Sequence, residues 1–324
     1  MTGPTSEPVA GEPTRLALGT ATLGNLLAEV SDERAREILE SAWQAGVRYF
    51  DTAPHYGLGL AERRLGEFLR TRPRDEFMVS TKVGRLLRQN PTWSGELDTD
   101  EHYLVPARLR RVWDLGLDGI RRSLEESLQR LGLDRVDVVY LHDPERSGKP
   151  LAPQERAEAL VRLREEGGAR EVGVGSMTTG TLAAFARTGL LDVLMVANRH
   201  SLLDQSAAKE VFPACREHGT RVVAAAVFNS GLLADPEPST SSYYDYESAP
   251  TAMVERARRI AAVCRDLAVP LRTAALQFAL RDPLVTHVVA GATEPEHVRE
   301  NVAALAEPVP DELWDRLHEE GLLR

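Results

Sequence analysis

The sequence predicts an α/β fold, a closed (β/α)8 TIM barrel, and three observations lead to it. Eight short apolar segments recur along the chain, and most of them are followed by an amphipathic segment with helical periodicity. The apolar segments are nearly continuous, as expected of parallel strands that are buried on both faces. No glycine-rich phosphate loop follows the first of them, which argues against the alternative, an open doubly wound sheet.

The elements follow one another in strict βα alternation. The first helix is predicted after Ser31, a residue type that caps helices; it has an acidic first turn and ends at Gly46. Further helices are predicted at residues 119–134, 153–168, 181–189, 204–219 and 295–307, and several end in glycine, as helix C-termini tend to. The eight strands are predicted at residues 16–20, 47–51, 77–82, 136–142, 171–175, 192–197, 221–227 and 285–290.

Two long loops interrupt this alternation. Residues 84–117 follow the third strand and carry Trp93, Tyr103 and Trp113, and residues 229–250 follow the seventh strand and contain SSYYDYESAP. Both come after strands and therefore lie on the C-terminal face of the barrel, where active sites of such barrels lie. The aromatic residues indicate a lid over a substrate, or else packing of each loop on itself.

Composition excludes several classes of function. The chain has 324 residues and a net charge of −10, without a basic surface pattern that would suit nucleic acid. No apolar run approaches the roughly 18 residues of a membrane helix. Residues 1–14 are polar and rich in Pro and Gly, and are expected to form a disordered leader before a single barrel domain at 15–324. Cys215 and Cys264 lie in helical patterns, which favours free thiols and a reducing cytoplasm. The oligomeric state stays open.

Four polar residues lie where predicted strands end. Asp51 closes the second strand, Lys82 the third and His142 the fourth, and Tyr56 follows Asp51 in the turn DTAPHYGLG. The carboxyl ends of all strands in such a barrel meet at one mouth. We therefore expect these four side chains to lie close together.

Together the four side chains suit proton transfer. A free tyrosine has a pKa of about 10, and a neighbouring ammonium such as that of Lys82 lowers it. A buried lysine needs a counter-ion, which Asp51 supplies, and His142 can orient a substrate oxygen or relay a proton. Taken singly, each residue also has an ordinary structural interpretation, as a turn cap, a loop aromatic, a solvated lysine or a structural histidine.

Three segments of the chain resemble the aldo-keto reductases. FDTAPHYGLGLAERRLGEFL is similar to the segment with their catalytic aspartate and tyrosine, VSTKVG to their lysine strand and VDVVYLHDPE to their histidine strand. The resemblance spans about residues 15 to 322. It implies a (β/α)8 barrel, reversible hydride transfer between a nicotinamide and a carbonyl or alcohol, and a catalytic tetrad of Asp51, Tyr56, Lys82 and His142.

Within that family, other segments are similar to the sugar-oxidising branch of L-fucose and D-threo-aldose 1-dehydrogenases, to which pyridoxal 4-dehydrogenase is related. These segments are STKVGRLL, YLHDPE, VFNSGLLA and LQFALRDPLVTHVVAGA. The resemblance implies a small-molecule substrate, an aldose oxidised at C1 to a lactone, with Tyr56 taking the hydroxyl proton. Two alternatives stay open: an NADPH-dependent reductase of aldehydes or ketones in a biosynthetic pathway, and a non-catalytic barrel that binds nicotinamide.

The resemblance also places a nicotinamide cofactor across the barrel mouth without a Rossmann phosphate loop. YGLGLAERRLG has Glu62 where the third glycine of such a loop would stand, and is interpreted as a turn that opens a helix. At four positions where many family members carry residues that contact the nicotinamide, this chain has different residues: Gly175, Ser176, Ala197 and Ala225. The resemblance implies that one set of residues contacts the nicotinamide and its ribose: Thr20, Ala21, Asp51, Ser176 and Ala197. It implies that a second set contacts the pyrophosphate through backbone N–H groups: Phe228, Ser230 and Leu232.

The segment AGATEPEHVREN is similar to the one that contacts the adenosine end of the cofactor. NADPH-preferring relatives carry a lysine and an arginine where this chain has Gly291 and His297, with Glu294 close by. Because these groups bind a 2′-phosphate poorly, NAD is the expected cofactor and NADP the alternative. No metal site is expected, since no supporting ligand spacing is found. The implied contacts are Gly291, Ala292, His297, Glu300 and Asn301.

Overall fold

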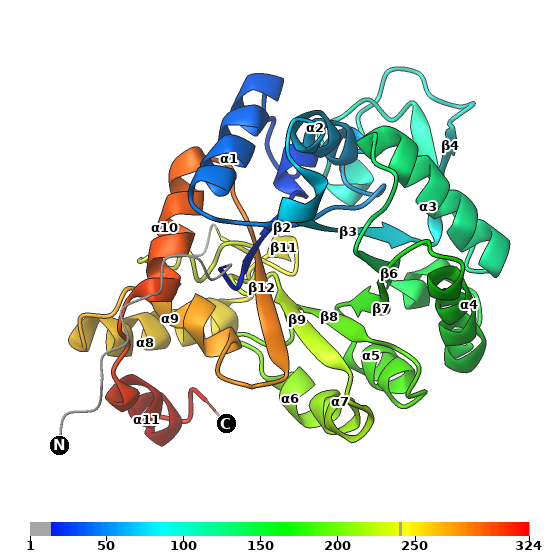
Figure 1. Ribbon diagram of the computed structural model, residues 1–324. Coiled ribbons are helices and arrows are strands. Elements are labelled where there is room, and N and C mark those ends of the chain that lie inside the picture. Colours follow the sequence, from blue (N-terminus) through cyan, green and yellow to red (C-terminus); the bar gives the residue numbers. More distant parts are fainter. Residues whose placement is uncertain (1–13, 240–241, 324) are drawn as a thin grey trace.

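Eight parallel strands close into a barrel (Figure 1), so the expected (β/α)8 fold is confirmed. The structure is a computed structural model that describes residues 14–239 and 242–323; residues 1–13 of the expected leader lie outside them. Each of the eight predicted strand segments contributes one barrel strand. Around the barrel these are β1 (Leu16–Gly19), β2 (Tyr49–Asp51), β3 (Met78–Val83), β6 (Val138–His142), β7 (Glu171–Ser176), β8 (Val193–Ala197), β9 (Arg221–Ala225) and β12 (Val285–Gly291).

Helices surround the barrel (Figure 1). The side chain of Ser31 caps the first of them, accepting from the N–H of Arg34 at 3.1 Å, as expected. The helix predicted at 204–219 is broken at Val211, because Pro213 has no N–H to continue the preceding turns. The helices are α1 (Asp32–Gln44), α2 (Leu60–Leu69), α3 (Leu117–Leu131), α4 (Pro153–Glu165), α5 (Thr179–Ala186), α6 (Ser206–Glu210), α7 (Phe212–His218), α8 (Thr251–Asp266), α9 (Leu271–Ala279), α10 (Pro295–Ala306) and α11 (Asp311–Glu319).

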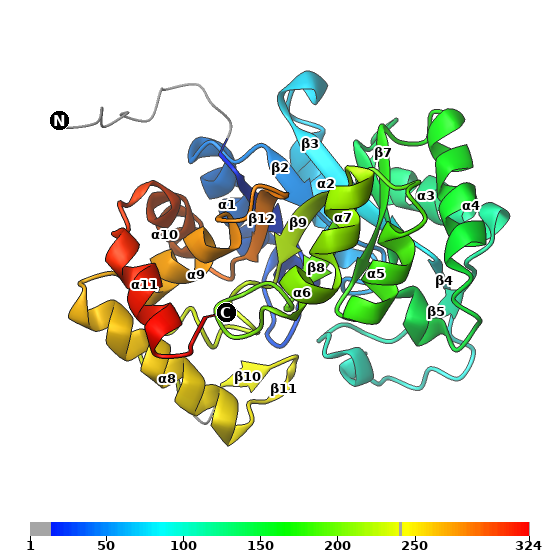
Figure 2. The same ribbon diagram turned by 90° about the horizontal axis from the view of Figure 1, so that it is seen from below.

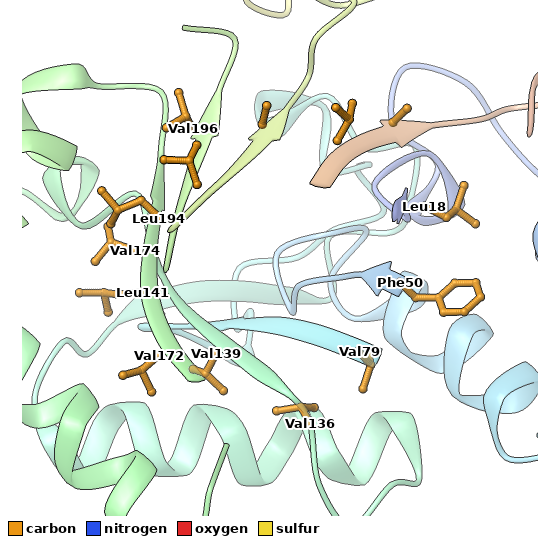
Figure 3. Packing of buried hydrophobic residues seen from close by; sticks show 14 of the residues in the cluster. Leu18, Phe50, Val79, Val136, Val139, Leu141, Val172, Val174, Leu194 and Val196 are labelled. Carbon is orange, nitrogen blue, oxygen red and sulfur yellow. The ribbon is translucent and has the colours of Figure 1, made fainter. Parts of the chain in front are cut away.

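The strands bury both of their faces. One set of side chains points outward into the layer between strands and helices, where Figure 3 shows Phe50, Val79 and Val139. The alternate set fills the barrel, where the hydroxyl groups of Tyr49 and Tyr140 lie 3.3 Å apart. Two buried faces explain why the strand sequences are apolar almost without interruption.

Both long loops form hairpins at the same end of the barrel (Figure 2). The loop after the third barrel strand pairs β4 (Arg85–Gln89) with β5 (Leu109–Trp113), and the loop after the seventh pairs β10 (Tyr243–Tyr244) with β11 (Glu247–Ser248). Tyr103, in the first loop, is 2% exposed and packs with Leu58, Leu87 and Val105. This loop is therefore anchored against the turn that carries Tyr56, which packs on the same cluster.

Two further findings concern the helices. Cys215 and Cys264 are both buried and free. Among the helices that the structure describes, none has the length and hydropathy needed to cross a bilayer.

Candidate active site

The alternation of side chains along the strands decides which residues reach the barrel mouth. In β2, Tyr49 points into the barrel, so Asp51 at the strand end points the same way. On β6, Tyr140 points into the barrel, and His142, two residues further on, points the same way. Lys82 on β3 reaches the same space, where it meets Asp51. All three side chains are buried, although strand ends are usually solvated.

Lys82 and Asp51 form a buried ion pair. Lys82 Nζ donates to Asp51 Oδ2 at 2.6 Å and to the main-chain oxygen of Thr52 at 3.0 Å. The hydroxyl of Ser80 donates to Asp51 Oδ1 at 2.7 Å. Both oxygens of the carboxylate are thus bonded, which offsets the desolvation of the two charges. The pair holds the ammonium at the mouth through two of its three donors.

Tyr56 is held beside this ammonium by close contact between two loops. Lys82 Nζ lies 4.6 Å from the centre of the Tyr56 ring, and the rings of Tyr56 and His142 are 6.0 Å apart. The loop is anchored where Gly57 meets Gly24: a Cβ at Gly57 would lie 2.3 Å from the Gly24 carbonyl oxygen, and its φ of +59° also favours glycine. The four residues expected at strand ends therefore do lie together.

The pKa of Tyr56 differs from the expected direction. Burial raises the pKa of its phenol well above the usual 10.0, and the negative charge of Asp51 raises it further. The expected lowering by Lys82 is not found, because the carboxylate of Asp51 balances the ammonium at 2.6 Å. The phenol is accordingly protonated at neutral pH.

His142 is a neutral imidazole at neutral pH. Burial lowers its pKa well below 6.5, and the positive charges of Arg85 and Lys82 lower it further. Arg85 is 1% exposed and pairs with Asp143, whose carboxylate lies 3.6 Å from His142 Nε2. A neutral imidazole donates from one nitrogen and accepts at the other, so His142 can bond a substrate hydroxyl in either role.

Further polar aromatic side chains line the same space, and the sequence did not assign them to it. The His55 ring lies 5.5 Å from the ring of His142 and 5.4 Å from that of Tyr103. Burial lowers the pKa of His55 well below 6.5, and its Nδ1 has no protein partner. The aromatic content of the loop after β3 was the signal for Tyr103, whereas His55 has no distinguishing local pattern.

Tyr246, in the β10–β11 hairpin, faces the mouth as well. Burial raises its pKa, and the charges of Asp143 and Lys82 act on it from the strand ends. The next residue back, Asp245, pairs with Arg199 at 2.6 Å, and the N–H of Tyr246 donates to Ser230 Oγ at 3.0 Å. The hairpin that carries Tyr246 is thus tied to the ends of β8 and β9 through Arg199 and Ser230.

The residues expected at the nicotinamide end lie at the carboxyl ends of three barrel strands, β1, β7 and β8. Thr20 is fully buried, and its hydroxyl donates to the main-chain oxygen of Asp51 at 3.0 Å. Ala21 precedes a short 3-10 helix, Ser176 ends β7 and Ala197 ends β8. Of these residues, Thr20 contacts Asp51 directly, whereas Ser176 and Ala197 end neighbouring strands on the other side of the barrel mouth.

The turn after β9 suits an anion. Asn229, Ser230 and Gly231 have φ values of 48°, 58° and 96°. Successive N–H groups in such turns form concavities that bind phosphate oxygens. The N–H groups of Asn229, Gly231 and Leu232 already donate to the carbonyls of Ala226, Phe228 and Asn229, at 2.9, 3.1 and 3.3 Å. The candidate donors of this turn are therefore the N–H groups of Phe228 and Ser230. Leu232 is not a free donor, in contrast to the expectation.

Asn301 and Glu300 meet an arginine that the sequence did not single out. Asn301 is buried, and its Oδ1 accepts from Arg272 at 2.8 Å. Glu300 lies 3.3 Å from the same guanidinium, which also stands 5.5 Å from the centre of the Phe228 ring. The bond to Arg272 orients the amide of Asn301, so its NH₂ group is the side available to a base.

The remaining adenosine-end positions carry no free cation. Gly291 ends β12 and is exposed, Ala292 accepts a bond from Thr22 at 2.7 Å, and His297 lies 3.3 Å from Thr293. Two arginines near this end are paired, Arg34 with Glu37 and Glu294 and Arg299 with Glu296.

Comparison with known proteins agrees with this geometry. The model of the Aldo/keto reductase family matches residues 15–320. The chain is 51% identical over 310 residues to a D-threo-aldose 1-dehydrogenase of a Pseudomonas species, covering 95% of this chain and 94% of that protein. It is 37% identical to the pyridoxal 4-dehydrogenase of Microbacterium luteolum, covering 96% and 94%.

Among solved structures, an aldo-keto reductase of Bacillus halodurans in its holo form superposes with a TM-score of 0.74 at 26% identity, covering 96% of this chain and 92% of that one. The glycerol dehydrogenase of Gluconobacter oxydans superposes with a TM-score of 0.71 at 21% identity, covering 96% and 92%, and supports the fold. These matches confirm the family resemblance and its sugar-oxidising branch.

Proposed function

Since this chain belongs to the Aldo/keto reductase family and is a nicotinamide-dependent oxidoreductase, we propose that it oxidises an aldose at C1 to a lactone, with NAD⁺ as its preferred cofactor. The observation that carries the proposal is the cluster of Asp51, Tyr56, Lys82 and His142 at the barrel mouth. The similarity to a D-threo-aldose 1-dehydrogenase supports the class of substrate.

The residues at the mouth fit a nicotinamide dinucleotide. The turn after β9 offers the N–H groups of Phe228 and Ser230 to a pyrophosphate, and the buried amide of Asn301 provides a donor for a base. When bound, the nicotinamide accepts or returns a hydride. The polar rings of His55, Tyr103 and Tyr246 provide partners for the hydroxyl groups of a sugar.

In the proposed mechanism, each member of the tetrad acts on the hydroxyl group at C1. Tyr56 exchanges the hydroxyl proton through its phenol oxygen. Lys82 places a positive charge 4.6 Å from the centre of the Tyr56 ring, and Asp51 holds Lys82 in place. His142, as a neutral imidazole, bonds the substrate oxygen and orients it toward the phenol.

The raised pKa of Tyr56 predicts a pH dependence that differs between the two directions. Oxidation needs the phenolate, and below the pKa its population rises about tenfold per pH unit. Because burial raises this pKa, kcat/KM for aldose oxidation is expected to increase steadily from pH 7 into the alkaline range. Carbonyl reduction needs the phenol and is expected to stay flat or fall. Initial rates in both directions over the same buffers test this; an oxidation rate independent of pH would contradict it.

The protonated phenol also supports a second candidate, reduction of aldehydes or ketones with NADPH. A panel of aldoses, pyridoxal and simple aldehydes, each with the oxidised and reduced forms of NAD and NADP, separates the two by the absorbance of the reduced nicotinamide. The proposal expects the highest kcat/KM with an aldose and NAD⁺. Higher kcat/KM for an aldehyde with NADPH would replace it.

The preference for NAD⁺ is expected to depend on Gly291 and His297. A Cβ at Gly291 would meet Thr22 at 3.5 Å, an ordinary contact, so a lysine fits there. The double variant Gly291→Lys/His297→Arg is expected to tighten NADP⁺ binding by about tenfold through charge-assisted hydrogen bonds to the 2′-phosphate. Calorimetric Kd values for NAD⁺ and NADP⁺ measure the change.

Gly180→Lys is the control for this variant, since Gly180 is exposed on α5 with open space around it. It adds a positive charge away from the adenosine end and is expected to leave both Kd values unchanged. Equal gains in NADP⁺ affinity in control and double variant would show a general charge effect and contradict the assignment.

A further inference from the structure

Glu145 carries a buried carboxylate oxygen without a partner at the barrel mouth. The residue lies three positions after His142, in the turn that follows β6. Its Oε1 accepts a hydrogen bond from Ser176 Oγ at 2.6 Å, and its Oε2 is buried with no hydrogen-bond partner among residues 14–239 and 242–323. A buried acceptor without a donor is costly, so this oxygen is suited to a ligand that brings one.

The position of this oxygen is set by two neighbouring strands. His142 and Gly175 are paired across β6 and β7, and Ser176 ends β7. Glu145 therefore lies between the proposed proton-transfer group and the strands expected to hold the nicotinamide. The family's serine and asparagine contacts to the carboxamide are replaced by Gly175 and Ser176 at this point.

Ser176 by itself cannot donate to a carboxamide. Its hydroxyl has one proton, which goes to Glu145, while its oxygen accepts from the N–H of Thr178 at 2.9 Å. The free hydrogen-bonding capacity at this end of β7 is thus an acceptor, Glu145 Oε2. A carboxamide NH₂ group supplies the matching donor.

The negative charge of Glu145 is also less compensated by nearby cations than the charges of the other carboxylates at the mouth. Asp51 pairs with Lys82 and Asp143 pairs with Arg85. For Glu145, no ion pair within 4.0 Å is present in the part of the chain that the structure describes, and the bond from Ser176 is neutral. A carboxylate in this position attracts the positively charged oxidised ring more than the neutral reduced ring.

From these contacts we infer that Glu145 recognises the nicotinamide carboxamide and favours binding of the oxidised over the reduced cofactor. The inference rests on the proposed function and deepens it, since tighter binding of NAD⁺ than of NADH favours oxidation of the substrate. Ser176 acts as a positioning residue that orients the carboxylate.

The test is the variant Glu145→Gln, studied by direct binding of nucleotides to the protein in the absence of substrate. The Kd for NAD⁺ is expected to rise about tenfold, the effect of losing one charge-assisted hydrogen bond. The Kd for NADH is expected to rise less, so the preference for NAD⁺ falls. Binding of ADP-ribose, which lacks the ring, is expected to be unchanged.

The acetylpyridine analogue of NAD⁺, in which a methyl group replaces the NH₂, locates the contact. The wild type is expected to bind it more weakly than NAD⁺, and Glu145→Gln is expected to reduce that difference. Glu210→Gln is the matched control, because Glu210 also accepts from a hydroxyl, that of Thr179, but on the exposed surface.

Two outcomes would overturn the inference. An unchanged Kd for NAD⁺ in Glu145→Gln would show that Glu145 does not contact the nicotinamide. Equally weakened binding of NAD⁺, NADH and ADP-ribose would show that Glu145 only supports the fold of the turn. Failure of the proposed function is distinguishable, since it would show in the substrate panel as a higher kcat/KM for an aldehyde with NADPH, whereas this test measures nucleotide binding without substrate.

Discussion

Tyr56→Phe is expected to lower kcat about a thousandfold with little change in nucleotide affinity. The substitution removes only the phenol oxygen, the group proposed to exchange the substrate proton, and positioned acid–base groups contribute roughly 10²- to 10⁴-fold. The ring that packs against Tyr103 and beside Lys82 remains. Steady-state kinetics with the best substrate of the panel, together with the Kd for NAD⁺, measures both quantities.

Tyr140→Phe is the control for this variant. Tyr140 is also a buried tyrosine of the barrel, and its hydroxyl bonds that of Tyr49 below the mouth. Its loss is expected to cost about 1 kcal/mol of stability and to leave kcat within a few-fold of the wild type. Full turnover by Tyr56→Phe would contradict the role of Tyr56. Another group would then exchange the proton, and His142, whose ring lies 6.0 Å from that of Tyr56, is a candidate.

Breaking the ion pair between Lys82 and Asp51 is expected to affect both stability and turnover. Asp51→Asn leaves a buried ammonium without its counter-ion, and Lys82→Met leaves a buried carboxylate bonded only by Ser80. Each single variant is expected to lower the free energy of unfolding by about 3–5 kcal/mol. Each is also expected to lower kcat severely, because the charge beside Tyr56 is lost or misplaced.

The double variant Asp51→Asn/Lys82→Met separates the two effects. With both charges removed, much of the stability is expected to return, whereas turnover is not. Urea unfolding and kcat on the same preparations test this, with the exposed pair Arg316 and Asp266 as the control whose removal costs less than about 1 kcal/mol. Recovery of turnover in the double variant would show that the pair only stabilises the fold.

The barrel and three of the four positions of the proposed tetrad were predictable from local pattern. Strand periodicity is a property of neighbouring residues, so the apolar runs at 47–51, 77–82 and 136–142 predicted both the strands and the polar residue at each end. The parallel topology then brought Asp51, Lys82 and His142 to one mouth without further information.

Other features of the site depend on segments that are distant in the sequence. Tyr246 reaches the mouth through a hairpin, and Arg272 meets Asn301 from another helix. The partner of Glu145 is Ser176, 31 residues further on. No local pattern encodes such pairings, because each depends on how separate loops pack on the finished barrel.

By itself, the sequence determined the eight-stranded barrel and which chemical groups arrive at its mouth, because both follow from the short-range alternation of apolar and polar residues. Only the tertiary structure decided the protonation of those groups. The pKa of Tyr56 is raised, not lowered, because burial under packed loops outweighs a lysine whose charge Asp51 already balances. Desolvation is the sum over all surrounding atoms, and those atoms come from the whole chain.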